Sequence, residues 1–246
     1  MCAGADAVIH IAGTINAPDR AAYDAGNVAG TASIVAAAQA AGVRRFVHVS
    51  SLAAREPGLS DYGASKAAAE AVVLGANLDT VIIRPPGVYG PGDRETLSFF
   101  RMISRGFAVL PGPGRFSLIE VGDLAGVLLA IAGNAYPGLA EVDDGHGGYT
   151  HAELASAIGA ALGRRPRLLR PPLGLLRVAA TLDTAIATIR ERLPTLSHGR
   201  VATFAHPDWV VQPSLALSAH LRGAPTALEP GLAATVAWYR QHGWLS

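Results

Sequence analysis

The 246-residue sequence predicts an α/β protein in which helices cover both faces of a parallel sheet. The first observation is an alternation of short apolar runs with longer alanine-rich segments of helical periodicity between residues 7 and 86. The second is composition: half of the residues are hydrophobic, which is enough to bury a core on each side of a sheet. Strands and helices that alternate in this way form right-handed βαβ units, so we expect parallel strands.

The first part of the chain supplies three strands and two helices. An apolar run at residues 7–13 is too short for a helix and predicts a buried strand. Residues 27–41 have apolar positions at helical spacing and stop before Gly42, a residue type that commonly follows a helix. The remaining elements expected here are a strand at 45–51, a helix at 62–75 and a strand at 80–86.

The second part is expected to be mostly helical. Helices are predicted at residues 96–105 and 121–133, with a strand at 140–144. Thr150 can cap a helix that runs to Leu162. Residues 173–189 predict an amphipathic helix packed on the protein, and a helix lying on a membrane surface is the less favoured alternative. We place the boundary between a first domain, 1–92, and a lobe, 93–246, whose elements partly return to the sheet.

Charge and cysteine content exclude several classes of protein. The formal net charge is +1, so no overall field directs the chain to nucleic acid or an anionic membrane, and any charged site must be local. Cys2 is the only cysteine and cannot form an internal disulfide, which favours a cytoplasmic protein. None of the eight histidines forms a ligand-like pair with a carboxylate, so we expect no metal site. The sequence contains no run of about 18 apolar residues, so we expect no insertion into a membrane.

The residues that carry chemistry are Tyr62 and Lys66, the second of which is the only lysine among 20 basic residues. They lie four residues apart on a predicted helix, hence on one face. Tyrosine has a pKa of about 10, and a nearby cation stabilises its phenolate. Ser51 ends the preceding strand, where open α/β sheets bind ligands. A tyrosine and a lysine at this spacing also occur by chance on surface helices, but the neighbouring strand ends favour an acid–base site.

Several further segments fit one pattern over nearly the whole chain. They are residues 4–13, the Asn-x-x-Gly-Thr helix start at 27–31, the strand end at 46–51, the Arg-Pro-Pro segment at 84–92, residues 121–125 and residues 228–240. With these segments the sequence resembles an extended short-chain dehydrogenase/reductase of the NAD-dependent epimerase/dehydratase type. The resemblance implies a Rossmann-like sheet, with residues 1–92 as a partial NAD(P)-binding domain and residues 93–246 as a substrate-binding lobe.

The resemblance also implies hydride exchange at a carbon that bears oxygen, with NAD or NADP as cofactor. Tyr62 would move the proton, and Ser51 would orient the substrate oxygen. Lys66 would bind the nicotinamide ribose and lower the pKa of Tyr62. Asn27 would complete a water-mediated proton relay or support the backbone of the site. The residues expected to contact the cofactor are Ala12, Gly13, Tyr62, Lys66, Arg84, Pro85 and Val88.

The family begins with a Gly-x-x-Gly-x-x-Gly segment that binds the pyrophosphate at a helix N-terminus, and nothing before Gly4 matches it. In an ordinary member, about 55 to 65 residues would precede the segment matched here. We therefore expect an N-terminally truncated sheet, weak dinucleotide binding by this chain and an exposed edge on the strand at residues 7–12. Such an edge can pair with a second copy, so a homodimer is one expectation.

Two functions are compatible with these features. The first is an NAD(P)-dependent oxidoreductase or epimerase acting on a hydroxyl or keto group of a sugar, a sterol-like compound or another small carbonyl substrate. The second is a catalytically silent family member that serves as a binding or interaction module. The arginine run at residues 164, 165, 167 and 170 allows contact with a phosphate-bearing substrate, although a solvated connection after a helix is favoured.

Overall fold

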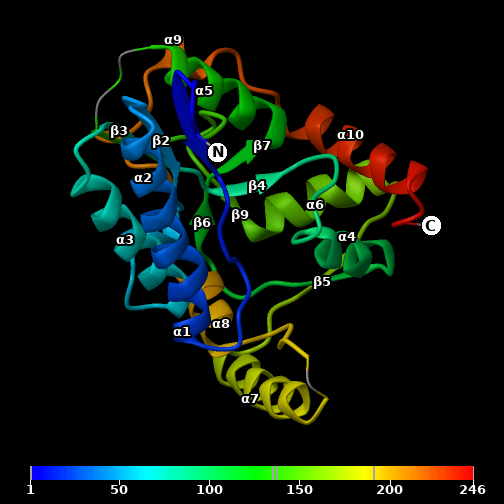
Figure 1. Ribbon diagram of the computed structural model, residues 1–246. Coiled ribbons are helices and arrows are strands. Elements are labelled where there is room, and N and C mark those ends of the chain that lie inside the picture. The colour runs from blue at the N-terminus through cyan, green and yellow to red at the C-terminus, as the bar shows by residue number, and fades with distance from the viewer. Residues whose placement is uncertain (1, 135, 137, 191, 246) are drawn as a thin grey trace.

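A four-stranded parallel sheet forms the centre of the molecule (Figure 1), as seen in a computed structural model that describes residues 2–134, 136, 138–190 and 192–245. The strand order is β1-β2-β3-β8. Ile9 lies opposite Val47, which places the first two strands side by side and parallel, as the sequence predicts. The bounds are β1 Ala7–His10, β2 Arg45–Val49, β3 Asp79–Arg84 and β8 Gly138–Glu141.

Helices cover both faces of this sheet, which confirms the predicted Rossmann-like α/β class. One face carries Phe46 and Ile82, which are buried in a cluster with Val35 and Val73 of the helices α2 and α3. Val47 and its neighbours on the opposite face pack under α5. The alternation follows from the twofold side-chain period of a strand. The bounds are α2 Gly30–Ala40, α3 Asp61–Leu74 and α5 Val121–Gly133.

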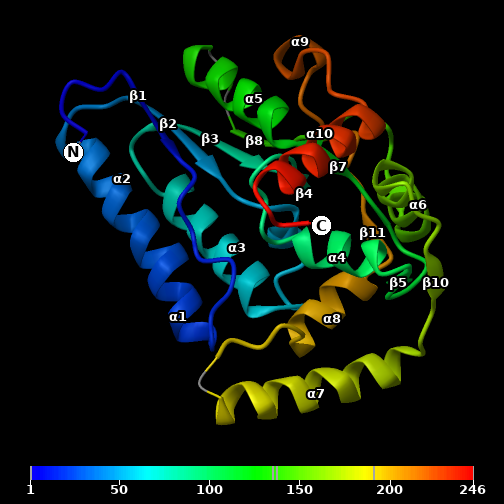
Figure 2. The ribbon, with the colours of Figure 1, turned by 90° about the vertical axis from the view of Figure 1, so that its right-hand side faces the viewer.

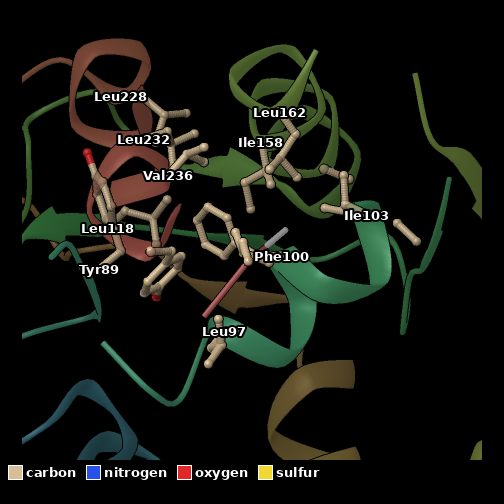
Figure 3. Close-up of a cluster of buried hydrophobic side chains, with 14 of the residues drawn as sticks. Tyr89, Leu97, Phe100, Ile103, Leu118, Ile158, Leu162, Leu228, Leu232 and Val236 are labelled. Atoms are coloured by element: carbon tan, nitrogen blue, oxygen red, sulfur yellow. The ribbon is translucent and has the colours of Figure 1, made fainter. Parts of the chain in front are cut away.

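A separate buried cluster forms the core of the second part of the chain (Figure 3). Phe100 packs edge-on against Tyr239, with ring centroids 5.2 Å apart. Trp238 and Trp244 pack on the same cluster. The helices here are α4 Leu97–Ser104, α6 His151–Leu162, α7 Leu173–Ile189, α8 His198–Ala205, α9 Ala219–Arg222 and α10 Leu228–Gln241. The short strands are β4 Gly87–Tyr89, β5 Phe107–Val109, β6 Arg115–Phe116, β7 Leu118–Glu120, β9 Tyr149–Thr150, β10 Arg167–Leu169 and β11 Asp208–Trp209.

Three elements differ from their predicted form. The helix expected to start at Asn27 begins earlier, because Asp19 caps α1 Arg20–Asp24 and the π-helix η1 Ala25–Ala29 joins it to α2. A short 3₁₀ helix, η2 Leu52–Arg55, follows β2. The helix α7 has its predicted bounds, but only Ala180 and Ala187 are buried, so most of it does not pack on the protein.

The strand β1 lies at the edge of the sheet, and Ile11 just beyond it is 61% exposed. The strand β8 lies after residue 92 and still joins the sheet, so the domain boundary at residue 92 stays a proposal. Within the residues that the structure describes, no helix combines the length and the apolar character needed to cross a membrane.

Candidate functional site

The structure brings Ser51, Tyr62 and Lys66 together at the carboxyl end of β2. Ser51 caps η2, and its hydroxyl accepts a hydrogen bond from the Ala53 amide at 3.1 Å. Lys66 is buried in α3 and donates from Nζ to the Val49 carbonyl at 2.7 Å. Tyr62 lies one turn earlier and is half-buried, and the Ser51 hydroxyl lies close enough to lower its pKa.

The position of α3 depends on a close approach at Gly63. The helix begins after Ser60, whose hydroxyl accepts a hydrogen bond from the Gly63 amide at 3.1 Å. A Cβ atom on residue 63 would lie 2.6 Å from the Ala53 carbonyl oxygen. The first turn of α3 can therefore lie against η2 only because residue 63 has no side chain. This contact places Tyr62 beside Ser51.

Burial shifts the pKa values of both Tyr62 and Lys66. Desolvation lowers the pKa of Lys66 to about 8, and the negative charge of Glu70 opposes that shift. Desolvation raises the pKa of Tyr62, while the Ser51 hydroxyl lowers it and the neighbouring Tyr23 and Glu95 add to the increase. Lys66 is not among the groups that shift this pKa, so the expectation that Lys66 lowers the pKa of Tyr62 stays a prediction. Because the net shift is upward, Tyr62 is protonated at neutral pH.

Asn27 is buried in η1, and both ends of its amide group have partners. Its nitrogen donates to the Thr14 carbonyl at 2.9 Å and to the Ser65 hydroxyl at 2.8 Å. Its oxygen accepts from the Thr14 amide at 2.7 Å. These bonds tie the loop after β1 to α3. Of the two roles expected for Asn27, the contacts favour support of the backbone.

Gly13 lets the loop after β1 pack closely against Asn27 and the Lys66 side chain of α3. A Cβ atom there would lie 2.9 Å from the Asn27 Oδ1 and 3.8 Å from the Lys66 Nζ. Ile11, Ala12 and Gly13 are all exposed. The exposed backbone of this loop therefore lies near the Lys66 ammonium, and binding of a nicotinamide dinucleotide there stays a prediction.

The predicted cofactor residues after β3 are placed differently. The Arg84 guanidinium donates to both carboxylate oxygens of Glu70, at 2.8 and 2.7 Å, so its side chain joins β3 to α3. Pro85 is buried, and its carbonyl accepts from the Leu52 amide at 2.9 Å. Val88 is half-buried in β4. The Arg84 guanidinium is thus already paired with Glu70. The predicted contact of Arg84 and Pro85 with the cofactor is supported only by where these residues lie in the chain.

Sequence reasoning missed a buried ionic network behind the site. The Ser50 hydroxyl donates to the Glu70 Oε1 at 2.5 Å, and Arg84 also lies 3.9 Å from the buried Glu141. Arg55 approaches Glu141 at 3.6 Å. One signal was available, because Glu70 follows Lys66 by four residues and so shares its helix face.

Two buried histidines lie beside Lys66. His10 and His48 are paired across β1 and β2, with ring centroids 5.5 Å apart. Burial, the Lys66 charge and His10 together lower the pKa of His48 to about 3. Burial and the Lys66 charge also lower the pKa of His10, whose ring nitrogen lies 3.1 Å from the Thr31 hydroxyl. Both rings are therefore neutral at pH 7, and neither adds charge to the site.

Residues 1–138 match the NAD dependent epimerase/dehydratase family, which is more than half of the chain. The protein belongs to this family. Over its whole length it is 39% identical to a ceramide reductase of Caulobacter vibrioides and spans 77% of that protein. A sterol-4-alpha-carboxylate 3-dehydrogenase of Candida albicans is 31% identical over 116 residues, which are 39% of this chain and 33% of the dehydrogenase.

Solved structures of the same fold superpose on almost the whole of this protein. An enzyme of Bordetella bronchiseptica, solved in complex with NAD⁺, superposes with a TM-score of 0.73 at 22% identity. The match covers 97% of this chain and 76% of the other. At this identity the comparison shows the fold, including the open parallel sheet at whose carboxyl edge Ser51 lies.

Proposed function

We propose that the protein is an NAD(P)-dependent oxidoreductase that reduces a keto group, or oxidises the corresponding hydroxyl, on a substrate with a long apolar chain. The observation that carries the proposal is the proximity of the Ser51 and Tyr62 hydroxyls, with Ser51 two residues beyond the Val49 carbonyl to which the buried Lys66 ammonium donates. A proton donor and a second hydroxyl at one point suit an oxygen atom that gains negative charge as its carbon is reduced.

When bound along residues 11–13, a nicotinamide dinucleotide supplies or accepts the hydride. The Lys66 ammonium would hold its ribose hydroxyls. The Ser51 hydroxyl donates a hydrogen bond to the substrate oxygen, and the Tyr62 hydroxyl transfers the proton to it. Because burial raises the pKa of Tyr62, the phenol enters the reaction protonated, which suits the direction of reduction.

A cavity beside the turn that precedes Tyr62 can take part of a substrate chain. Its volume is about 480 Å³, and its lining combines apolar residues such as Leu59 and Leu173 with the polar side chains of Arg177, His198 and His206. The helix α8 borders the site, since a Cβ atom on Gly199 would lie 3.0 Å from the Cβ of Ser60, two residues from Tyr62. The similarity to a ceramide reductase over the whole chain favours this substrate class over a nucleotide sugar, since the matches to a sterol dehydrogenase and to a UDP-glucose 4-epimerase cover only part of the chain.

The test measures oxidation of NADH and NADPH with a long-chain ketone of the ceramide type and, separately, with a nucleotide-linked keto sugar. Because weak dinucleotide binding is expected for this chain, the cofactor is raised until the rate saturates. We then expect turnover with the lipid ketone, and a loss of about 10² to 10⁴ in kcat for Tyr62→Phe. Tyr136→Phe is the matched control, because it removes the same hydroxyl from a half-buried tyrosine on the other side of the sheet.

Three outcomes contradict parts of the proposal. Turnover with the sugar alone removes the substrate class. Unchanged kcat in Tyr62→Phe, with the fold intact by circular dichroism, removes the proposed proton donor. Dinucleotide binding without turnover of any carbonyl compound favours a catalytically silent binding module instead.

A further inference from the structure

The helix α7 exposes an apolar stripe on the side that faces away from the protein. The stripe consists of Leu175, Val178, Leu182, Ile186 and Ile189, which are 45 to 82% exposed. Successive members are three or four residues apart, so they share one face of the helix. The buried residues of α7, Ala180 and Ala187, lie on the opposite side, where the helix packs against α8.

Exposed apolar side chains are concentrated around this helix. Among the residues that the structure describes, 15 large hydrophobic side chains are exposed, and nine of them lie between residues 168 and 193. Figure 2 shows α7 at one end of the molecule, beneath α8. A contiguous patch of this kind is unusual on a soluble protein and indicates a binding surface.

The same segment is strongly basic. Residues 164–192 contain seven arginines and two acidic residues, a formal charge of +5 in a chain whose total is +1. Arg170 lies just before α7, and Arg190 follows its last turn. All seven arginines are exposed, and they are Arg164, Arg165, Arg167, Arg170, Arg177, Arg190 and Arg192. An apolar helix face bordered by arginines is complementary to an anionic lipid surface, where the side chains insert between the acyl chains and the guanidinium groups bind phosphates.

We propose that α7 docks this protein on the surface of an anionic membrane. The charge of the segment argues against a second copy of the chain as the occupant, since a symmetric dimer would bring two groups of like charge together. The docking stands on the exposed stripe and the arginines and does not depend on the proposed reaction. If that reaction holds, the site lies close to the lipid surface, because α8 contacts both α7 and Ser60, two residues before Tyr62.

The test is cosedimentation of the protein with vesicles of phosphatidylcholine alone and with vesicles that also contain phosphatidylglycerol. We expect binding to the anionic vesicles that weakens with salt, and little binding to the neutral ones. The variant Leu175→Ser/Leu182→Ser/Ile189→Ser should bind at least about tenfold more weakly. The variant Leu74→Ser/Leu129→Ser is the matched control, because both leucines are similarly exposed but lie on α3 and α5.

A second pair of variants tests the charges without changing the stripe. Arg170→Gln/Arg190→Gln should weaken binding to anionic vesicles by roughly fivefold for each arginine, whereas Arg44→Gln/Arg105→Gln, at exposed positions elsewhere, should change it little. The proposal is overturned if the wild-type protein binds neither kind of vesicle, or if both pairs of arginine variants behave alike. It is also overturned if sedimentation velocity shows a dimer that the stripe variant dissociates, because the stripe would then be an interface between two copies.

Discussion

Burying the charged form of Lys66 lowers the free energy of unfolding below about pH 10. The size of this effect follows from the difference between the pKa of Lys66 in the folded and in the unfolded chain. Its pKa falls from 10.5 to about 8 on burial, so the unfolded chain binds more protons than the folded one between these values. The free energy of unfolding then rises with pH in that window by about 1.4 kcal/mol per pH unit, which totals about 3 kcal/mol. Lys66 is only 5% exposed, so solvent screening reduces this figure little.

The assay compares urea unfolding of the wild-type protein and Lys66→Met at several values from pH 7 to pH 10.5. Other groups titrate alike in both proteins, so the difference between their free energies of unfolding isolates Lys66. We expect that difference to move by about 3 kcal/mol in favour of the wild type as the pH rises. Ser65→Ala is the control, because it removes buried hydrogen bonds from the same helix without removing a titrating group. A difference between wild type and Lys66→Met that stays constant with pH would refute the lowered pKa.

Two further substitutions test the support of the site. Gly13→Ala should raise the KM for the dinucleotide by roughly tenfold and also lower Tm, because the new Cβ atom would displace the Asn27 amide, whose hydrogen bonds tie this loop to α3. An unchanged KM would show that the cofactor does not use this loop. Glu70→Gln should lower the free energy of unfolding by about 3 kcal/mol, because it removes the carboxylate that binds the half-buried Arg84 through two hydrogen bonds and leaves only Glu141, at 3.9 Å, as its charged neighbour. For comparison, Asp24→Asn at the exposed pair with Arg20 should cost about 0.5 kcal/mol or less in the same urea titration.

The parallel sheet could be predicted because its signals are local. Each strand is a short apolar run, each helix has its own periodicity, and the caps at Thr150 and Gly163 are visible in the sequence. The start of the helix near residue 20 was missed because Asp19 acts as its cap through a bond to the Ala22 amide, in a segment with little apolar periodicity. The exposure of α7 was missed for another reason: periodicity shows that a helix has an apolar face but does not show what covers it.

The residues of the site were also accessible from the sequence, but their electrostatics were not. Ser51, Tyr62 and Lys66 follow from the ends of predicted strands and from helical spacing. The direction of the Tyr62 shift depends on burial by segments far away in the chain, which spacing does not reveal. The pairing of Arg84 with Glu70 joins residues on two different elements, so spacing along the chain did not reveal it, and the cofactor contact expected of Arg84 stays a prediction.

Glu70 links the charge of Lys66 to the pairing of Arg84. Its carboxylate binds Ser50 and Arg84 and also raises the pKa of Lys66, in opposition to burial. Without that charge the ammonium would be buried beside two neutral histidines and would lose its proton more readily. A lysine that is to hold ribose hydroxyls must stay charged in a site that excludes water, and a buried carboxylate one turn along the same helix meets that need. The arginine in turn neutralises the carboxylate, so that neither charge is left unpaired in the core. The network that sequence reasoning overlooked therefore keeps the predicted site in its working charge state.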